Sequence, residues 1–120
     1  MTTPTPPQPA YTYAAKVVRW VDGDTVDLAV DCGFHITVNG RFRLYGIDTP
    51  ERGQANYVEA RRFAQSLTPE GSDVVVKTYA IDEKYGRFLA DIYPPHSTAT
   101  VNQALVAAEL AKVYFGGTKG

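Results

Sequence analysis

Alternation of apolar and polar side chains is the feature that most restricts how this 120-residue chain can fold. Between residues 25 and 31, valine or leucine occupies every second position, and residues 36–44 resume the pattern on either side of Asn39–Gly40. A period of two is that of a half-buried β-strand. Asp22–Gly23 is a turn signal, so residues 13–21 are predicted to precede this run as a first strand. The break at Asn39–Gly40 is consistent with either a bulge or a second hairpin tip.

The middle of the chain changes to helical spacing and then returns to strands. Apolar residues recur every three or four positions from residue 57 to residue 67, which predicts an amphipathic helix. Strands are predicted from about residue 74 to 80 and again over residues 88–93. A second helix is predicted after Thr100, because Gln103 follows three residues later as in a capping box.

The predicted order is three strands, a helix, two strands and a second helix that continues toward Val113. Five short strands in one small domain predict an α+β fold that is mainly β, either a mostly antiparallel barrel or a curled sheet. Closure into a barrel would remove the exposed edges of an open sheet. We expect the domain to span residues 13–116, with a flexible proline-rich tail over residues 1–12 and a short tail over residues 117–120.

Composition is typical of a soluble protein with one domain. The apolar content of 44% and the charged content of 21% are ordinary for such a chain, and its length allows a core without disulfides. The single cysteine, Cys32, excludes an internal disulfide framework. No apolar run reaches the roughly 20 residues of a membrane-spanning helix. Since no export signal is evident either, we expect a cytoplasmic monomer with no membrane partner.

The net charge restricts the class of nucleic-acid partner. A formal charge of −1 argues against a protein that coats nucleic acid regardless of sequence, because such a protein carries a basic excess. The same charge is compatible with a nuclease, because acidic metal ligands lower the formal count and a bound cation restores positive charge at the site.

Three motifs place carboxylates or a guanidinium at the ends of strand-like runs. They are Asp22–Thr25, Arg43–Glu51 and Asp82–Arg87. The carboxylates of Asp24, Asp48 and Glu51 are oxygen donors of the kind that hard divalent cations prefer. Arg43 and Arg87 carry planar forks that match phosphate oxygens. A cation beside paired arginines suits phosphodiester hydrolysis, although each aspartate taken singly would more readily be a turn former.

Other polar and aromatic residues have plainer interpretations. Trp20 ends an apolar strand and is expected in the core or at its rim. Arg61 and Arg62 are expected on a solvated helix face, with a patch that follows a phosphate backbone as the minority alternative. Asn102 is expected to make local hydrogen bonds near the start of the second helix.

Four motifs occur in order along nearly all of the predicted domain. They read Asp-Gly-Asp-Thr-Val, Arg-Leu-x-Gly-Ile-Asp-Thr-Pro-Glu, Asp-x-Lys-Tyr-Gly-Arg-x-Leu-Ala-x-Ile-Tyr and Val-Asn-x-Ala-Leu-Val. Together they resemble the staphylococcal nuclease (thermonuclease) family, in a short, intracellular-type form. The resemblance implies a five-stranded OB-fold barrel with two flanking helices, a fold that usually binds nucleic acid across one face.

The resemblance also implies a calcium site and a catalytic group. The ligands of Ca²⁺ would be Asp24, Asp48 and the backbone carbonyl of Thr49. Glu51 would be the general base or would position the attacking water. Arg43 and Arg87 would grip the scissile phosphate and neutralise charge in the transition state. In this family such a site hydrolyses DNA or RNA with little sequence preference and leaves a 3′-phosphate and a 5′-hydroxyl.

Further substrate contacts are implied outside the metal site. Lys84 and Tyr85 would contact a neighbouring phosphate, and Tyr114 would stack on a base. The chain departs from the family pattern in a longer segment between Asp24 and Arg43 and in the absence of a third, C-terminal helix. The alternative is a non-catalytic OB-fold module that binds single-stranded nucleic acid or a protein partner, and a purely structural domain is a third possibility.

Overall fold

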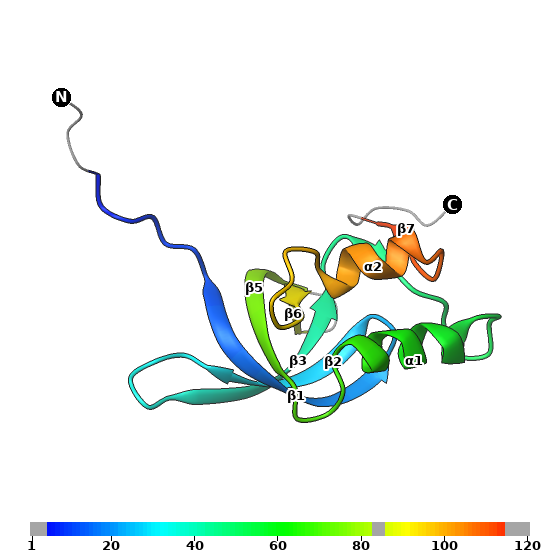
Figure 1. The fold of residues 1–120 in the computed structure, drawn as a ribbon, viewed down its shortest axis with the longest axis horizontal. Helices are drawn as coiled ribbons and strands as arrows, with labels where there is room; N and C mark the ends of the chain where they lie inside the picture. Colours follow the sequence, from blue (N-terminus) through cyan, green and yellow to red (C-terminus); the bar gives the residue numbers. More distant parts are fainter. Residues whose placement is uncertain (1–4, 83–85, 115–120) are drawn as a thin grey trace.

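The strands of the chain close into a barrel, and two helices lie against it in the described residues (Figure 1). The computed structural model describes residues 5–82 and 86–114. The barrel strands are β1 (Thr12–Asp22), β2 (Thr25–Asp31), β3 (Thr37–Leu44), β5 (Asp73–Asp82) and β6 (Arg87–Tyr93). A separate two-stranded sheet joins β4 (Ile47–Asp48) to β7 (Lys112–Val113), and the helices are α1 (Tyr57–Leu67) and α2 (Val101–Ala107).

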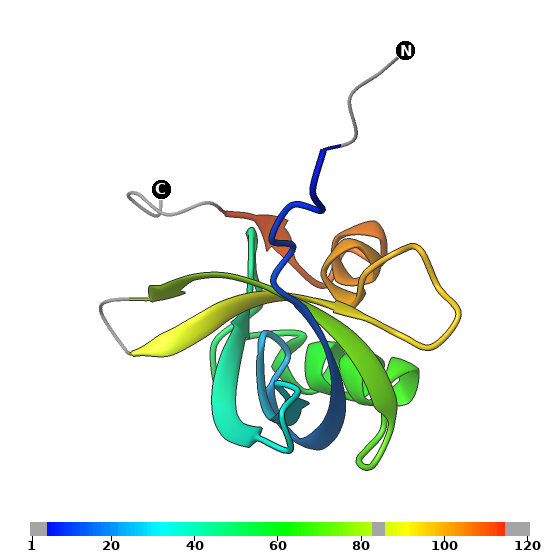
Figure 2. The same ribbon diagram turned by 90° about the vertical axis from the view of Figure 1, so that its left-hand side faces the viewer.

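The strand order around the barrel is β1-β2-β3-β6-β5, and β5 pairs again with β1. All of these pairs are antiparallel except β3 with β6, which run parallel at Phe42, Arg43 and Leu44. Figure 2 shows the strands curving around the barrel, with both helices on one side of it. The arrangement is that of an OB-fold, so the predicted fold class is confirmed.

The first hairpin forms as predicted, whereas β3 differs from both sequence alternatives. The β1–β2 turn lies at Gly23–Asp24, between the paired residues Asp22 and Thr25. Asn39 and Gly40 sit inside β3 in unbroken register with β2. They form neither a bulge nor a hairpin tip. A Cβ at Gly40 would lie 3.4 Å from the Phe42 ring, and this glycine therefore leaves room for that ring.

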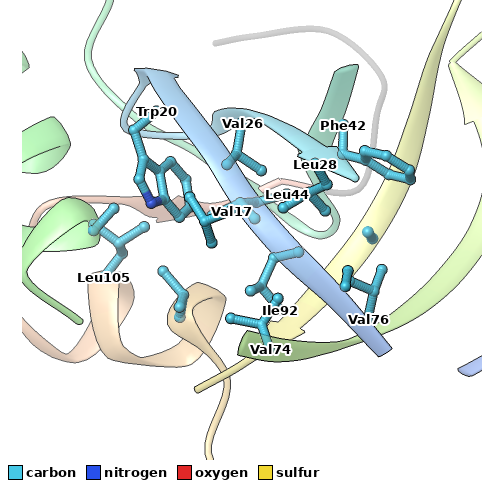
Figure 3. Close-up of a cluster of buried hydrophobic side chains, with 14 of the residues drawn as sticks. Val17, Trp20, Val26, Leu28, Phe42, Leu44, Val74, Val76, Ile92 and Leu105 are labelled. Atoms are coloured by element: carbon cyan, nitrogen blue, oxygen red, sulfur yellow. The ribbon is translucent and has the colours of Figure 1, made fainter. Parts of the chain in front are cut away.

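The core is built from the inward side chains of the barrel and from the helix faces that cover its open side. Its members include Val17, Trp20, Leu28, Phe42, Leu44, Ile92 and Leu105, all buried (Figure 3). The Trp20 indole N–H donates a hydrogen bond of 3.0 Å to the carbonyl of Thr68 at the end of α1. The tryptophan therefore joins β1 to the helix from inside the core, and its predicted packing role is confirmed.

Both helices begin where the sequence predicts, but only α1 also has the predicted length. α1 has the predicted bounds, and the capping box of Thr100 and Gln103 opens α2. The prediction that the second helix continues toward Val113 is wrong. The backbone of Glu109 is left-handed, with φ of 59°, and the chain turns back so that Lys112–Val113 pairs with β4. Within the described residues, neither helix is long and apolar enough to cross a bilayer.

Candidate active site

The β1–β2 turn and the end of β3 bring the first two motifs together. Thr25 pairs with Arg43 across β2 and β3, and the amide of Leu44 donates a hydrogen bond of 2.8 Å to the carbonyl of Asp24. After a turn at Gly46, where φ is 78°, β4 carries Asp48 back toward the same place. The ends of β2, β3 and β4 therefore form one site.

Arg43 links the two aspartates at the centre of this site. Its Nη2 atom lies 3.2 Å from Oδ1 of Asp48 and 3.6 Å from Oδ2 of Asp24. Only 12% of the Arg43 side chain is exposed, with 13% for Asp24 and 22% for Asp48. Charges in such sheltered positions interact more strongly than on an open surface. The structure thus brings together three of the six residues predicted for metal binding and catalysis.

Asp24 is held rigidly by the backbone and side chains around it. Its carboxylate accepts hydrogen bonds of 3.2 Å from the Thr49 amide and from the Thr25 hydroxyl. Gly23 allows the turn to approach α1, because a Cβ there would lie 2.8 Å from the Cβ of Ala60. A side chain at residue 23 would push the turn away from the helix and move Asp24 with it.

Arg87, at the start of β6, approaches the same cluster of side chains around Asp24. Its Nη1 atom lies 3.5 Å from the Thr25 hydroxyl, which in turn donates to Asp24. Tyr114 lies on the other guanidinium, with its ring centroid 5.7 Å from Cζ of Arg43. Its amide donates a hydrogen bond of 2.8 Å to the carbonyl of Gly46. Tyr114, predicted to stack on a base, therefore lies at the site and packs against Arg43 in this structure.

Of the remaining predicted residues, only Glu51 lies in the part of the chain that the structure describes. The side chain of Glu51 is exposed, and its amide donates to Oε1 of Gln54 at 2.7 Å. In the part of the chain that the structure describes, no three Asp, Glu, His or Cys side chains gather as a metal site, so Glu51 does not join the two aspartates. Lys84 and Tyr85 lie outside the described residues.

The donor chemistry of the site fits a hard divalent cation. Asp24, Asp48 and Thr49 present carboxylate, carbonyl and hydroxyl oxygens, which are ligands that Ca²⁺ accepts. Thr49 is buried, and its Oγ1 atom has no hydrogen-bond partner among the described residues. A buried hydroxyl without a partner is costly, so an additional donor or cation near it would be stabilising.

Asn102 supports the segment that carries Asp48. Its amide nitrogen Nδ2 donates to the carbonyls of Tyr45 at 2.9 Å and Ala90 at 3.1 Å. Its oxygen Oδ1 accepts a bond of 3.3 Å from the amide of Ile92. The expectation of local bonds is wrong, since these partners lie on β6 and just after β3. One buried side chain therefore ties α2 to the backbone immediately before β4.

Removal of the Asn102 amide should destabilise the protein strongly. Asn102→Ala leaves a buried N–H and two carbonyls without this partner, and we expect a loss of about 2–4 kcal/mol in the free energy of unfolding. Urea unfolding followed by circular dichroism measures this loss. Asn39→Ala, at an exposed position in β3, is the control and should change stability by less than about 1 kcal/mol. Equal losses of stability in the two variants would contradict the proposed role of Asn102 in linking α2 to the backbone before β4.

An aromatic pair next to the site was missed by sequence reasoning. The rings of Tyr45 and Tyr79 stack with centroids 4.1 Å apart, and the Tyr79 hydroxyl donates to Asp91 at 2.7 Å. Burial and the bond to Asp91 raise the pKa of the Tyr79 phenol above its ordinary value. Tyr45 occupies the variable position of the Arg-Leu-x-Gly motif, so its aromatic character was the only available signal.

The strand order and the arginine-bridged aspartates define an OB-fold domain with an acidic site at its strand ends. The model of the staphylococcal nuclease homologue family matches residues 41–119, and the chain belongs to this family. The resemblance found in the four motifs is therefore confirmed.

Named relatives agree with this assignment. A protein called uncharacterized endonuclease from Escherichia coli O157:H7 is 37% identical over 99 residues, covering 82% of this chain and 60% of that protein. A micrococcal nuclease of Shigella flexneri is 40% identical over 83 residues, covering 69% of this chain and 44% of the relative. Protein ParB of Escherichia coli is 33% identical over 110 residues, covering 82% of this chain and 56% of that protein. The chain thus spans about half the length of these relatives.

Proposed function

We propose that this chain is a calcium-dependent nuclease that hydrolyses phosphodiester bonds of DNA, RNA or both with low sequence specificity. The observation that carries the proposal is the bridging of Asp24 and Asp48 by Arg43, with Arg87 joined to Asp24 through Thr25. Relatives named endonuclease and micrococcal nuclease support the same reaction class.

Asp24, Asp48 and the carbonyl of Thr49 are the proposed ligands of Ca²⁺. Bound there, the ion supplies positive charge to the carboxylates and polarises a phosphoryl oxygen. Arg43 then has less need to neutralise the aspartates, and its guanidinium can donate to the phosphate. Arg43 is placed for this change of partner, because it already lies between the two carboxylates.

The chain's own residues carry the remaining steps. Arg43 and Arg87 donate N–H groups to the phosphate oxygens and stabilise the charge that builds up as water adds to phosphorus. Glu51 accepts the proton of the attacking water. The bond from phosphorus to the 5′ oxygen breaks, and that oxygen takes up a proton, so the products are a 3′-phosphate and a 5′-hydroxyl.

Low sequence specificity follows from what the proposed contacts recognise. Arginines and a cation bind phosphate groups, which every nucleotide carries. Lys84 and Tyr85 are proposed to contact the next phosphate and Tyr114 to stack on a base, and stacking is tolerant of base identity. The protein is proposed to act as a monomer on nucleic acid alone.

Calcium removal should abolish cleavage. We expect digestion of denatured DNA to fall by about 10³-fold in EGTA, because metal-ion stabilisation of the transition state amounts to several kcal/mol. Activity should return when Ca²⁺ is added in excess. The measurement is the rate of release of acid-soluble nucleotides with and without the chelator.

A matched pair of variants separates the metal site from a general charge effect. Asp48→Asn should raise the Ca²⁺ concentration needed for half-maximal rate, whereas Asp73→Asn, which changes an exposed carboxylate paired with Lys16, should not. Binding of DNA without any cleavage that the chelator prevents would contradict the nuclease. It would favour the alternative, a non-catalytic OB-fold module that binds single strands.

A further inference from the structure

A second arginine cluster lines a hollow beside the active site. The hollow has a volume of about 400 Å³ and lies between β1 and α1. Arg19 of β1, Arg52 of the loop after Glu51 and Arg61 of α1 contribute guanidinium groups to its lining. Gln65 and Glu70 complete the polar part of its wall.

The described residues that line this hollow carry an excess of positive charge. Three arginines and one acidic residue, Glu70, line it, which gives a formal charge of +2. Among the described residues, Arg19, Arg52 and Arg61 form no ion pair, whereas Arg41 pairs with Asp27 and Arg43 with two aspartates. An anion is the ligand class that such a set of planar forks would bind.

Arg61 gives a second, independent sign of a missing acceptor. Its Nε atom is buried and has no hydrogen-bond partner in the described part of the chain. A buried N–H group of a cation without an acceptor carries a cost that an anion would remove. Arg61 is half-buried, so the expectation of a solvated helix face is wrong for it. Arg62 is exposed as expected.

Two arginines of the hollow lie close in the chain to residues at the proposed active site. Arg52 directly follows Glu51 in the chain, and Arg61 follows Ala60, whose Cβ contacts the turn at Gly23. Asp24 is the next residue after that glycine. The segments that carry Arg52 and Arg61 are therefore joined to the active site, one through Glu51 in the chain and the other through the packing of Ala60 against the turn before Asp24.

We propose that this hollow binds a backbone phosphate of the polynucleotide strand that is being cut, at a nucleotide away from the scissile bond. The inference rests on the proposed nuclease function. The open hollow, of about 400 Å³, is larger than one phosphate group. Such a contact adds affinity for longer strands without reading their sequence.

Binding of a labelled single strand tests the inference without any cleavage. We measure fluorescence anisotropy with a DNA of about 12 nucleotides in EGTA, over a range of salt concentrations. Arg61→Gln should weaken binding by about five- to tenfold and reduce the slope of log Kd against log salt by about 0.7, the value for one lost contact to a single strand. Arg62→Gln changes the same charge on the neighbouring exposed residue and should have less than about a twofold effect.

The length of the ligand distinguishes a polynucleotide site from a site for free phosphate. A dinucleoside monophosphate offers only the scissile phosphate, so its kcat/KM should be equal in the wild type, Arg61→Gln and Arg62→Gln. Equal effects of Arg61→Gln and Arg62→Gln on the longer strand would overturn the inference. The inference would also be overturned if Arg61→Gln weakened the binding of inorganic phosphate but left the affinity for the longer strand unchanged. Since the binding assay needs no cleavage, failure of the nuclease proposal would appear separately, as absent turnover.

Discussion

Glu51→Gln is expected to lower kcat by about 10²–10⁴-fold, the usual contribution of a general base. Gln keeps the size and the polar character of the side chain but cannot accept the proton of the attacking water. The fold should be unaffected, because the Glu51 side chain is exposed and Gln keeps its size. The measurement is single-turnover cleavage of a labelled oligonucleotide at saturating Ca²⁺.

Calcium affinity decides the role of Glu51. The structure does not gather Glu51 with Asp24 and Asp48, so we expect Ca²⁺ binding of Glu51→Gln, measured by calorimetry, to remain close to that of the wild type. Glu59→Gln, which alters an exposed acid in the first turn of α1, is the matched control and should leave both the rate and the affinity unchanged. If Ca²⁺ affinity fell in step with the rate, Glu51 would be a metal ligand and not a base.

Arg87→Lys is expected to reduce kcat/KM by about 10²–10³-fold, as the loss of one transition-state donor does elsewhere. Lysine keeps the positive charge, but it lacks the planar fork that binds two phosphate oxygens at once. Arg87 is a cleaner target than Arg43, because Arg43 also neutralises two sheltered carboxylates and its removal would destabilise the fold.

Arg41→Lys provides the comparison for Arg87→Lys. Arg41 pairs with Asp27 on the surface of the barrel, at 2.8 Å, and its bond to Asp27 lowers the pKa of that carboxyl. The change keeps the charge on a strand arginine outside the site and should leave kcat/KM within about a factor of two. Near-native turnover of Arg87→Lys with an intact circular dichroism spectrum would argue against the proposed clamp.

Local patterns in the sequence were enough to predict most of the fold. The alternation of apolar and polar residues predicted β2 and most of β3. Apolar residues spaced three or four positions apart predicted α1 with its observed bounds, and the pair Thr100 and Gln103 predicted the start of α2. These features depend on neighbours within a few residues, so the sequence contains them directly. The end of α2 was wrong because it depends on pairing between Lys112–Val113 and the distant β4.

The site could be predicted only as a set of residue types. Motif order indicated Asp24, Arg43 and Asp48, and the structure adds that Arg43 lies between the two carboxylates. The role of Asn102 was missed because its partners are far away in the chain, although its type was compatible with hydrogen bonding. The burial of Arg61 was missed because the spacing of apolar residues in α1 does not reveal how closely β1 approaches this helix.

The central claim is that these dispersed acids and arginines form one site for a metal ion and a phosphate. A crystal structure of the protein soaked with Ca²⁺ and a nucleotide bisphosphate tests it most directly. We expect an ion in contact with the carboxylates of Asp24 and Asp48 and an oxygen of Thr49, with a phosphate held by Arg43 and Arg87. An ion bound away from both aspartates, or a phosphate touched by neither arginine, would contradict it.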